Sequence, residues 1–335
     1  MNHLDFDALL KKGALPSVLL FEGEEEYLKQ KALADLRAAL LPAGMEELNE
    51  TTLTGPAPDE IIASCETLPF LADRRLVIVR EERSLSGRSE ADEKLLDYFP
   101  KVPPSAVLLF FCREKPDGRK KLYAAVKKLN GIVTFSPLKD RELASFVTAA
   151  FRDQGKECDE RTAEYLVFTS GSDLNQLLAE VAKISSHNLD STSVSPDEVA
   201  ALATPSLECT VFQMVDAVVA RQSSRAFALL QNQLKQGADR MYILSMLLRQ
   251  FRLLQHVKIM QFEKRTQEEI RSALGVPPFA LNQYLRQASF YTGGQVKQAV
   301  KICFDTEYAV KSGKMNQDGA LEAAILKILY LSENE

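Results

Sequence analysis

The feature that most constrains the fold is a change of pattern at Pro137. Short apolar runs alternate with amphipathic segments before this residue, and only amphipathic segments follow it. The apolar runs have the length and the branched side chains that are typical of buried strands. They lie at residues 17–21, 49–53, 76–79, 107–112 and 132–135. Segments with helical periodicity, at 25–41 and 119–129, lie between some of them. Strands separated by helices predict a parallel sheet that is covered on both faces.

The chain after Pro137 is predicted to be all helical. We expect four helices first, and then a boundary near Thr204-Pro205-Ser206 that is followed by longer amphipathic helices. A chain of 335 residues is also too long for one compact core. The sequence therefore predicts three domains: an α/β domain at 1–139, a small helical domain at 140–206 and an all-α domain at 207–335.

Charge and cysteine usage exclude several classes of function. The formal net charge of −5 argues against a protein whose main task is to grip a phosphate backbone alone, because that affinity needs clustered lysine and arginine. The five cysteines are scattered without a CxxC pair, so neither a zinc site nor a disulfide framework is indicated. The start of the chain has no basic segment before an apolar core, and no apolar run is long enough to span a membrane. We expect a cytoplasmic protein without a metal site.

The first helical segment begins where a nucleotide-binding protein would have its phosphate loop. The layout resembles the AAA+ modules, whose loop has the pattern G-x-x-x-x-G-K-[ST] after the first strand. Counted from Gly23, Lys29 has the expected spacing, but Leu28 replaces the second glycine and Gln30 replaces the hydroxyl residue. Glutamates at 24–26 also occupy the helix N-terminus and would repel a triphosphate. We therefore expect a degenerate P-loop, no cofactor and no ATPase activity.

Two large apolar residues, Phe70 and Leu71, stand in an unusual place. They follow Pro69 and precede the charged stretch at 73–75, which leads into the predicted strand at 76–79. This context indicates a short turn or loop ahead of the strand. Exposed apolar side chains at a loop tip usually mark a partner. The alternative interpretation is that both side chains fold back under their own sheet, and the pattern alone does not separate the two.

Fragments along nearly the whole chain resemble one known family, the delta subunits of the bacterial DNA polymerase III clamp loader. In the first domain these fragments are Phe21-Glu-Gly-Glu-Glu-Glu-Tyr-Leu, the stretch 68–79, and Leu129-Asn-Gly-Ile-Val-Thr-Phe-Ser-Pro-Leu138. The second domain has Gly171-Ser-Asp-Leu-Asn and Glu180-Val-Ala-Lys-Ile. The third has Val211-Phe-Gln-Met-Val-Asp-Ala217, Leu247-Leu-Arg-Gln-Phe-Arg252, Leu274-Gly-Val276 and Val310-Lys-Ser-Gly313. Each fragment is weak alone, and their order and spacing carry the resemblance. One departure is Glu307, where the family pattern has an aspartate four residues before Lys311.

The resemblance implies a fold and a task. Delta subunits have an AAA+-like α/β domain without a working phosphate loop, a small helical lid domain and an all-α collar domain. They bind the beta sliding clamp and open its ring, so that the loader complex can place it on primed DNA during DNA replication. By position, Phe70 and Leu71 match the apolar wedge of the family that binds the clamp, and Leu68 is a possible flanking contact.

The resemblance also implies which other subunits this chain would join, and that it would have no catalytic activity. The collar would join the delta prime and gamma/tau subunits in a hetero-pentamer that holds primed DNA, without a membrane partner. The chain would then be a non-ATPase, non-catalytic subunit of a DNA-directed DNA polymerase, a nucleotidyltransferase holoenzyme. Two alternatives are a DNA-dependent AAA+ ATPase and a helical protein–protein adaptor unrelated to replication.

Other side chains give weaker signals. The three histidines lie far apart without the carboxylate or cysteine partners of a triad or metal site. A basic cluster before and within the segment 119–129 would either contact DNA inside the loader or form a solvated helix face, and the second interpretation is favoured. Its members are Lys115, Arg119, Lys120, Lys121, Lys127 and Lys128.

Overall fold

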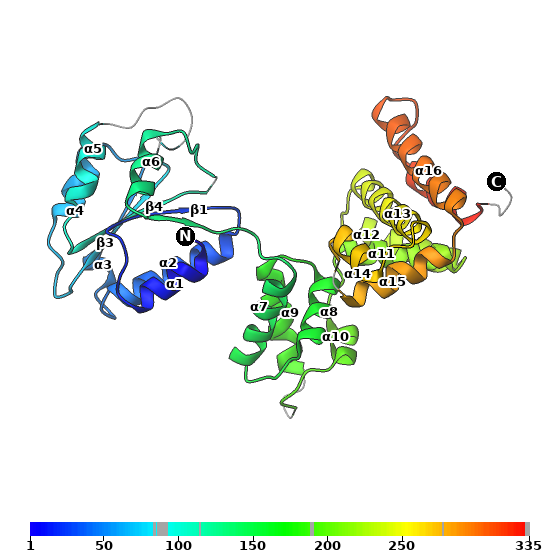
Figure 1. Ribbon diagram of the computed structural model, residues 1–335, viewed down its shortest axis with the longest axis horizontal. Helices are drawn as coiled ribbons and strands as arrows, with labels where there is room; N and C mark the ends of the chain where they lie inside the picture. The colour runs from blue at the N-terminus through cyan, green and yellow to red at the C-terminus, as the bar shows by residue number, and fades with distance from the viewer. Residues whose placement is uncertain (83–84, 86–92, 114, 188–190, 277, 332–335) are drawn as a thin grey trace. The chain divides into compact units, whose positions relative to one another are not determined.

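The computed structural model describes residues 1–82, 85, 93–113, 115–187, 191–276 and 278–331 (Figure 1). The chain forms two compact units, Met1–Leu138 and Lys139–Glu335. The predicted division of the helical part at 206 stays a prediction, and the last four residues of the predicted third domain, 332–335, lie outside the described residues.

The first unit is built on a five-stranded parallel sheet with the order β2-β3-β4-β1-β5. The strands are β1 (Val18–Glu22), β2 (Glu50–Thr54), β3 (Arg75–Arg80), β4 (Ala106–Phe111) and β5 (Ile132–Thr134). The three central strands are buried almost throughout, because parallel strands connected by helices are covered on both faces. The parallel sheet predicted from the sequence is confirmed, with strand ends that differ from the predicted ones by at most one residue.

Helices cover both faces of this sheet, as Figure 1 shows. Side chains alternate along β1, so that Val18 and Leu20 face one layer while Leu19 and Phe21 face the other. The first layer packs on α4 (Pro58–Glu66), α5 (Glu93–Tyr98) and α6 (Lys121–Lys128). On the other face lie α1 (His3–Lys11) and α2 (Glu26–Leu40), and the ring of Phe6 meets that of Phe21 edge to face at 5.1 Å. A short helix, α3 (Glu46–Asn49), connects α2 to β2, and a 3-10 turn, η2 (Phe99–Lys101), precedes β4.

The described part of the second unit is helical, apart from one isolated bridge between Glu157 and Ser193. Its first four helices are α7 (Asp140–Asp153), α8 (Glu160–Ser170), α9 (Leu174–His187) and α10 (Pro196–Leu202). Ser195 caps α10 with a capping box.

Longer helices follow in the order predicted from their apolar periodicity. They are α11 (Leu207–Val219), α12 (Ser223–Lys235), α13 (Arg240–Phe262), α14 (Gln267–Leu274), α15 (Pro278–Ser289), α16 (Gly293–Lys311) and α17 (Ala320–Leu329). Their apolar faces form one core around α13. A buried polar link joins three of these helices, because Gln250 donates to Gln287 at 2.8 Å and Gln287 donates to Asp216 at 2.9 Å. Among the described residues, no helix is long and apolar enough to cross a membrane.

Candidate functional site

The loop between α4 and β3 carries three exposed large apolar side chains, two of which are the most exposed among the described residues of the first unit. Leu68 is 80% exposed, Leu71 is 72% exposed and Phe70 is 54% exposed. The interpretation in which Phe70 and Leu71 fold back under the sheet is therefore wrong. The strand that follows fills the core by itself, since Leu76, Val77 and Ile78 are fully buried. The loop thus offers three apolar side chains to solvent, next to a rigid strand.

One buried side chain, Asn49 at the end of α3, holds this loop in place. The backbone N–H of Phe70 donates to Asn49 Oδ1 at 2.7 Å. Asn49 Nδ2 in turn donates to the carbonyl oxygen of Phe70 at 3.0 Å and to that of Met45 at 3.1 Å. The amide of Asn49 thus fixes both backbone polar groups of Phe70 while the Phe70 side chain stays outside. We call this set of bonds the Asn49 latch.

Arg75, the first residue of β3, holds the start of the same loop. Its guanidinium donates to the carbonyl oxygen of Thr67 at 3.2 Å and to the hydroxyl of Thr51 on β2 at 2.9 Å. Between the two anchors, Leu71 has a φ of 49°, a left-handed conformation that is uncommon for a residue other than glycine. Such a conformation persists where the surrounding structure fixes it. The loop is therefore preorganised, although its side chains are exposed.

Sequence reasoning found the exposed side chains but missed Asn49. The pattern placed this residue at the start of the second strand, whereas the structure ends α3 there and starts β2 at Glu50. The one sequence signal for Asn49 was its place as a polar residue directly before an edge strand. Many turns have such a residue, so this signal does not identify a positioning residue. The partner of Asn49 lies 21 residues away in the chain, beyond the reach of local periodicity.

The position of the degenerate P-loop is closed by the protein's own side chain. Lys29 is completely buried, and its ammonium donates to the carbonyl oxygens of Cys112 at 3.0 Å and Arg113 at 3.3 Å. It also pairs with Glu26 at 2.8 Å. Burial alone would raise the pKa of Glu26, but the hydrogen bonds and the positive charge from Lys29, together with Gln30, lower it. Lys29 therefore stabilises the end of β4 and is not directed at a ligand.

The backbone at Gly23 packs closely against the backbone of Phe135. Gly23 has a φ of 116°, and an added Cβ would overlap the carbonyl oxygen of Phe135. The N–H of Glu25 donates to that same carbonyl at 3.1 Å, so it does not point at a ligand. Leu28 is buried, and Gln30 is hydrogen-bonded to Glu26 at 2.7 Å on the surface. The predicted P-loop residues thus lie together, but as a packed helix start.

The predicted basic cluster lies on α6 and the turn before it. Arg119 is 91% exposed and forms an ion pair with Asp117 at 2.9 Å. This pair holds the pKa of Asp117 at about 2, because the Arg119 side chain and backbone donate hydrogen bonds to its carboxylate. Lys121 approaches Glu93 at 3.9 Å. These contacts fit a solvated helix face, and DNA contact by the cluster stays a prediction.

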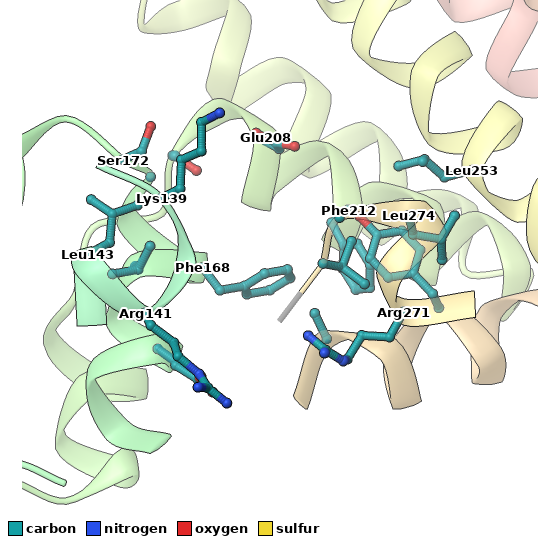
Figure 2. A pocket seen from close by; sticks show the side chains of 18 of the residues that line it. Lys139, Arg141, Leu143, Phe168, Ser172, Glu208, Phe212, Leu253, Arg271 and Leu274 are labelled. Atoms are coloured by element: carbon teal, nitrogen blue, oxygen red, sulfur yellow. The ribbon is translucent and has the colours of Figure 1, made fainter. Parts of the chain in front are cut away.

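A cavity of about 1400 Å³ lies in the second unit, between side chains of α7, α8, α11 and the helices that follow (Figure 2). Phe168 and Phe212 meet in it edge to face, with ring centroids 5.3 Å apart. Ion pairs with Glu208 and Glu268 engage two of its arginines, Arg249 and Arg271. It contains none of the site residues predicted from the sequence.

Side chains that could bind a metal do not gather in the described part of the chain. No group of three or more histidine, cysteine or carboxylate side chains with the arrangement of a metal site occurs there. Burial raises the pKa of the thiols of Cys65, Cys112, Cys158 and Cys303 to about 12, so they are weak nucleophiles at neutral pH.

Comparison with known proteins places the chain in a family. The family "DNA polymerase III, delta subunit" matches residues 19–136, and "DNA polymerase III delta subunit, C-terminal domain" matches residues 208–328. DNA polymerase III subunit delta of Bacillus subtilis (strain 168) is 27% identical over 333 residues, which are 97% of this chain and 96% of the relative. The probable DNA polymerase III subunit delta of Aquifex aeolicus (strain VF5) is 23% identical over 241 residues, which are 69% of this chain and 67% of the relative.

A solved structure supports the same assignment and confirms the predicted fold class. The DNA clamp loader delta protein of Bacillus subtilis has a TM-score of 0.57 and 26% identity to this chain, and the match covers 98% of this chain and 100% of that one. The parallel sheet and the helical part that follows it fit the AAA+-like fold expected for such a protein. This chain therefore belongs to the family of delta subunits of the bacterial DNA polymerase III clamp loader.

Proposed function

We propose that this subunit binds the beta sliding clamp through Phe70 and Leu71, with Leu68 as a flanking contact, and opens the ring of the clamp. The observation that carries the proposal is the contrast within one loop. Phe70 and Leu71 are 54% and 72% exposed, while the Asn49 latch holds the backbone beneath them. Solvent-exposed apolar side chains on a fixed backbone are the usual anchors of a protein interface.

The exposed fractions set the size of the expected effect. Full burial of such a side chain is worth about 1.5 to 3 kcal/mol, and the exposed fractions reduce this gain to about half for Phe70 and three-quarters for Leu71. Together the two residues would contribute about 2 to 4 kcal/mol, or about 30-fold to 1,000-fold in affinity. This binding energy favours an open ring only if the open clamp offers these side chains a better site than the closed clamp does.

The binding test uses the full chain and purified sliding clamp. Phe70→Ala with Leu71→Ala should raise the Kd by the factor given above and leave the melting temperature nearly unchanged. The matched control is Leu4→Ala on α1, since Leu4 is an apolar residue of the same unit with 60% exposure. It should change neither quantity. Undiminished clamp binding by the double variant would show that Phe70 and Leu71 do not bind the clamp.

Ring opening needs its own measurement. A clamp labelled with two fluorophores across one subunit interface reports separation of that interface. Addition of the wild-type chain should reduce energy transfer, whereas the double variant should not do so even at a concentration that saturates its remaining binding. A chain that binds the clamp without changing energy transfer would support a tether instead of an opener.

We also propose that the domains divide the work, with the α/β domain 1–139 on the clamp and the parts 140–206 and 207–335 as lid and collar. The collar would join the delta prime and gamma/tau subunits around primed DNA. Large apolar side chains at the ends of its helices stay exposed, among them Phe262 at 90% and Tyr330, directly after α17, at 77%, which supports further protein contacts. The fragment 139–335, a compact unit in the structure, should associate with the other loader subunits in gel filtration but not with the clamp.

No catalytic step is assigned to this subunit. Lys29, the residue at the spacing of a P-loop lysine, is fully buried and bonded to backbone carbonyls. Gly23 lies against the backbone of Phe135. Both observations support a structural role for this corner and weigh against the DNA-dependent ATPase alternative.

A further inference from the structure

Leu48, on the short helix α3, is an exposed apolar side chain outside the α4–β3 loop. We call that loop, which carries Leu68, Phe70 and Leu71, the wedge loop. Among the described residues of the first unit, the large apolar side chains with high exposure are Leu4, Leu48, Leu68, Phe70 and Leu71. Leu48 is 57% exposed, about as much as Phe70. Four of these five residues therefore lie on only two connections, the α2–β2 connection and the α4–β3 loop.

The Asn49 latch brings these two connections together. Asn49 follows Leu48 directly, and its side-chain amide bonds the N–H and the C=O of Phe70 at 2.7 Å and 3.0 Å. Since consecutive Cα atoms are about 3.8 Å apart, these bonds place the Cα atoms of Leu48 and Phe70 within about 11 Å of each other. A protein interface of standard size covers about 800 Å² on each partner. An interface of that size centred on Phe70 is therefore wide enough to extend to Leu48.

The α2–β2 connection also borders Leu71. An open recess of about 560 Å³ is lined by residues 39–42, from the end of α2 onward, and by residues 71–73 of the wedge loop. Leu71 thus forms part of a wall whose other part belongs to the chain segment that leads to α3. The two connections are thus joined at two places, by the Asn49 latch at Phe70 and by the recess beside Leu71.

We propose that the α2–β2 connection is a second part of the clamp-binding surface, in which Leu48 contacts the sliding clamp and Asn49 positions Phe70. This inference rests on the proposed function, and it commits to the clamp as occupant because the Asn49 latch and the recess join this connection to the loop that carries Phe70 and Leu71. Asn49 is fully buried and touches the partner only through Phe70, so it is a positioning residue. Leu48 adds apolar area at the edge of the same patch.

The test measures clamp affinity of the full chain for Leu48→Ala and for the control Leu4→Ala. The exposed fraction of Leu48 predicts a Kd that is about 4-fold to 20-fold higher. The control should stay within about 2-fold of wild type, and neither substitution should lower the melting temperature, because both side chains are exposed. A Leu48→Ala Kd equal to that of the control would overturn the proposal.

The role of Asn49 needs a readout that a merely structural residue would not change. Asn49→Ala should raise the Kd about 10-fold or more, but it should also lower stability, because it leaves buried backbone groups unpaired. The two effects separate in a double-mutant cycle with Phe70→Ala. The effect of Asn49→Ala on affinity should be at least about 3-fold smaller in the Phe70→Ala background, while its effect on stability should be the same in both. Equal effects on affinity in both backgrounds would overturn the positioning role.

The outcomes distinguish failure of this inference from failure of the proposed function. If Phe70→Ala with Leu71→Ala keeps full clamp binding, the proposed function fails and takes this inference with it. If the double variant loses binding but Leu48→Ala does not, only the inference fails. If Leu48→Ala weakens association with the other loader subunits instead of the clamp, the occupant of this surface is a subunit and the proposal is wrong.

Discussion

Lys29 allows a sharp test of whether the corner after β1 is structural or a remnant of nucleotide binding. Its buried ammonium bonds the carbonyl oxygens of Cys112 and Arg113, which lie at the end of β4, and pairs with Glu26. Lys29→Ala would remove three buried methylene groups, worth about 2.4 kcal/mol at about 0.8 kcal/mol each. It would also leave two carbonyls unpaired, at about 1 to 3 kcal/mol each. Relief of the desolvation cost of the ammonium, several kcal/mol, offsets part of this loss. We expect a net destabilisation of about 2 to 4 kcal/mol.

Lys29→Met separates the two contributions, because methionine keeps most of the stem but donates no hydrogen bond. It should cost about 2 kcal/mol less than Lys29→Ala. Because the chain has two compact units, a single unfolding curve would mix them, so the assay should report on the first unit alone. Hydrogen exchange of peptides from β1 and β4, followed by mass spectrometry, gives the opening free energy of this sheet.

The refuting result is equally specific. If protection of β1 and β4 in Lys29→Ala equals that of wild type, the buried ammonium does not stabilise the sheet. If calorimetry with magnesium present also shows micromolar ATP binding by wild type that Lys29→Ala abolishes, the corner is a nucleotide site and the proposed non-catalytic role is wrong.

Two further predictions concern the same corner. Gly23→Ala should destabilise the first unit by about 2 to 4 kcal/mol, because an added Cβ meets the Phe135 carbonyl and the φ of 116° suits only glycine. The control Gly13→Ala, with open space around the added Cβ, should cost about 1 kcal/mol. If both variants lose the same amount of hydrogen-exchange protection, the contact between Gly23 and Phe135 is unimportant. Glu26→Gln should destabilise at pH 7 and less in acid, since the lowered folded-state pKa of Glu26 gives stability that is present above its unfolded value of 4.5 and is lost as the pH falls through the folded value. Hydrogen exchange of wild type and Glu26→Gln, with rates corrected for pH, measures how the stability difference between them depends on pH. A stability difference that grows as the pH falls would contradict the prediction.

The helical part of the fold was predictable because its signal is local. The amphipathic segments expected after residue 206 are present as long helices, among them α13 over Arg240–Phe262. The strands were equally legible, since buried parallel strands are continuous apolar runs. Helices α1 and α4 were not predicted, because each is a nine-residue segment with only one or two buried side chains. The order of strands was not predicted either, since it depends on long-range pairing.

In the candidate site, too, the features with a local sequence signal were predicted and those that depend on long-range contacts were not. Phe70 and Leu71 were found because apolar residues next to Pro69 and a charged stretch break a local rule, although the sequence could not tell exposed from buried. The structure settled their exposure through contacts that no local pattern contains. Asn49 reaches Phe70 across 21 residues, and Arg75 reaches Thr51 across 24. A residue that fixes a site from another connection cannot be identified from the local sequence around the site.

The Asn49 latch has a consequence for short inhibitors of the same interaction. A peptide copied from residues 68–73 would contain the apolar side chains but not the amide that fixes their backbone. It would lose about 1 to 2 kcal/mol of backbone entropy for each residue that it orders on binding, a cost already met in the folded protein. The left-handed conformation at Leu71 would add to that cost. The recognition element is therefore discontinuous, and a compact mimic must join the segment around Asn49 to the loop, for instance through a covalent bridge in place of the hydrogen bonds.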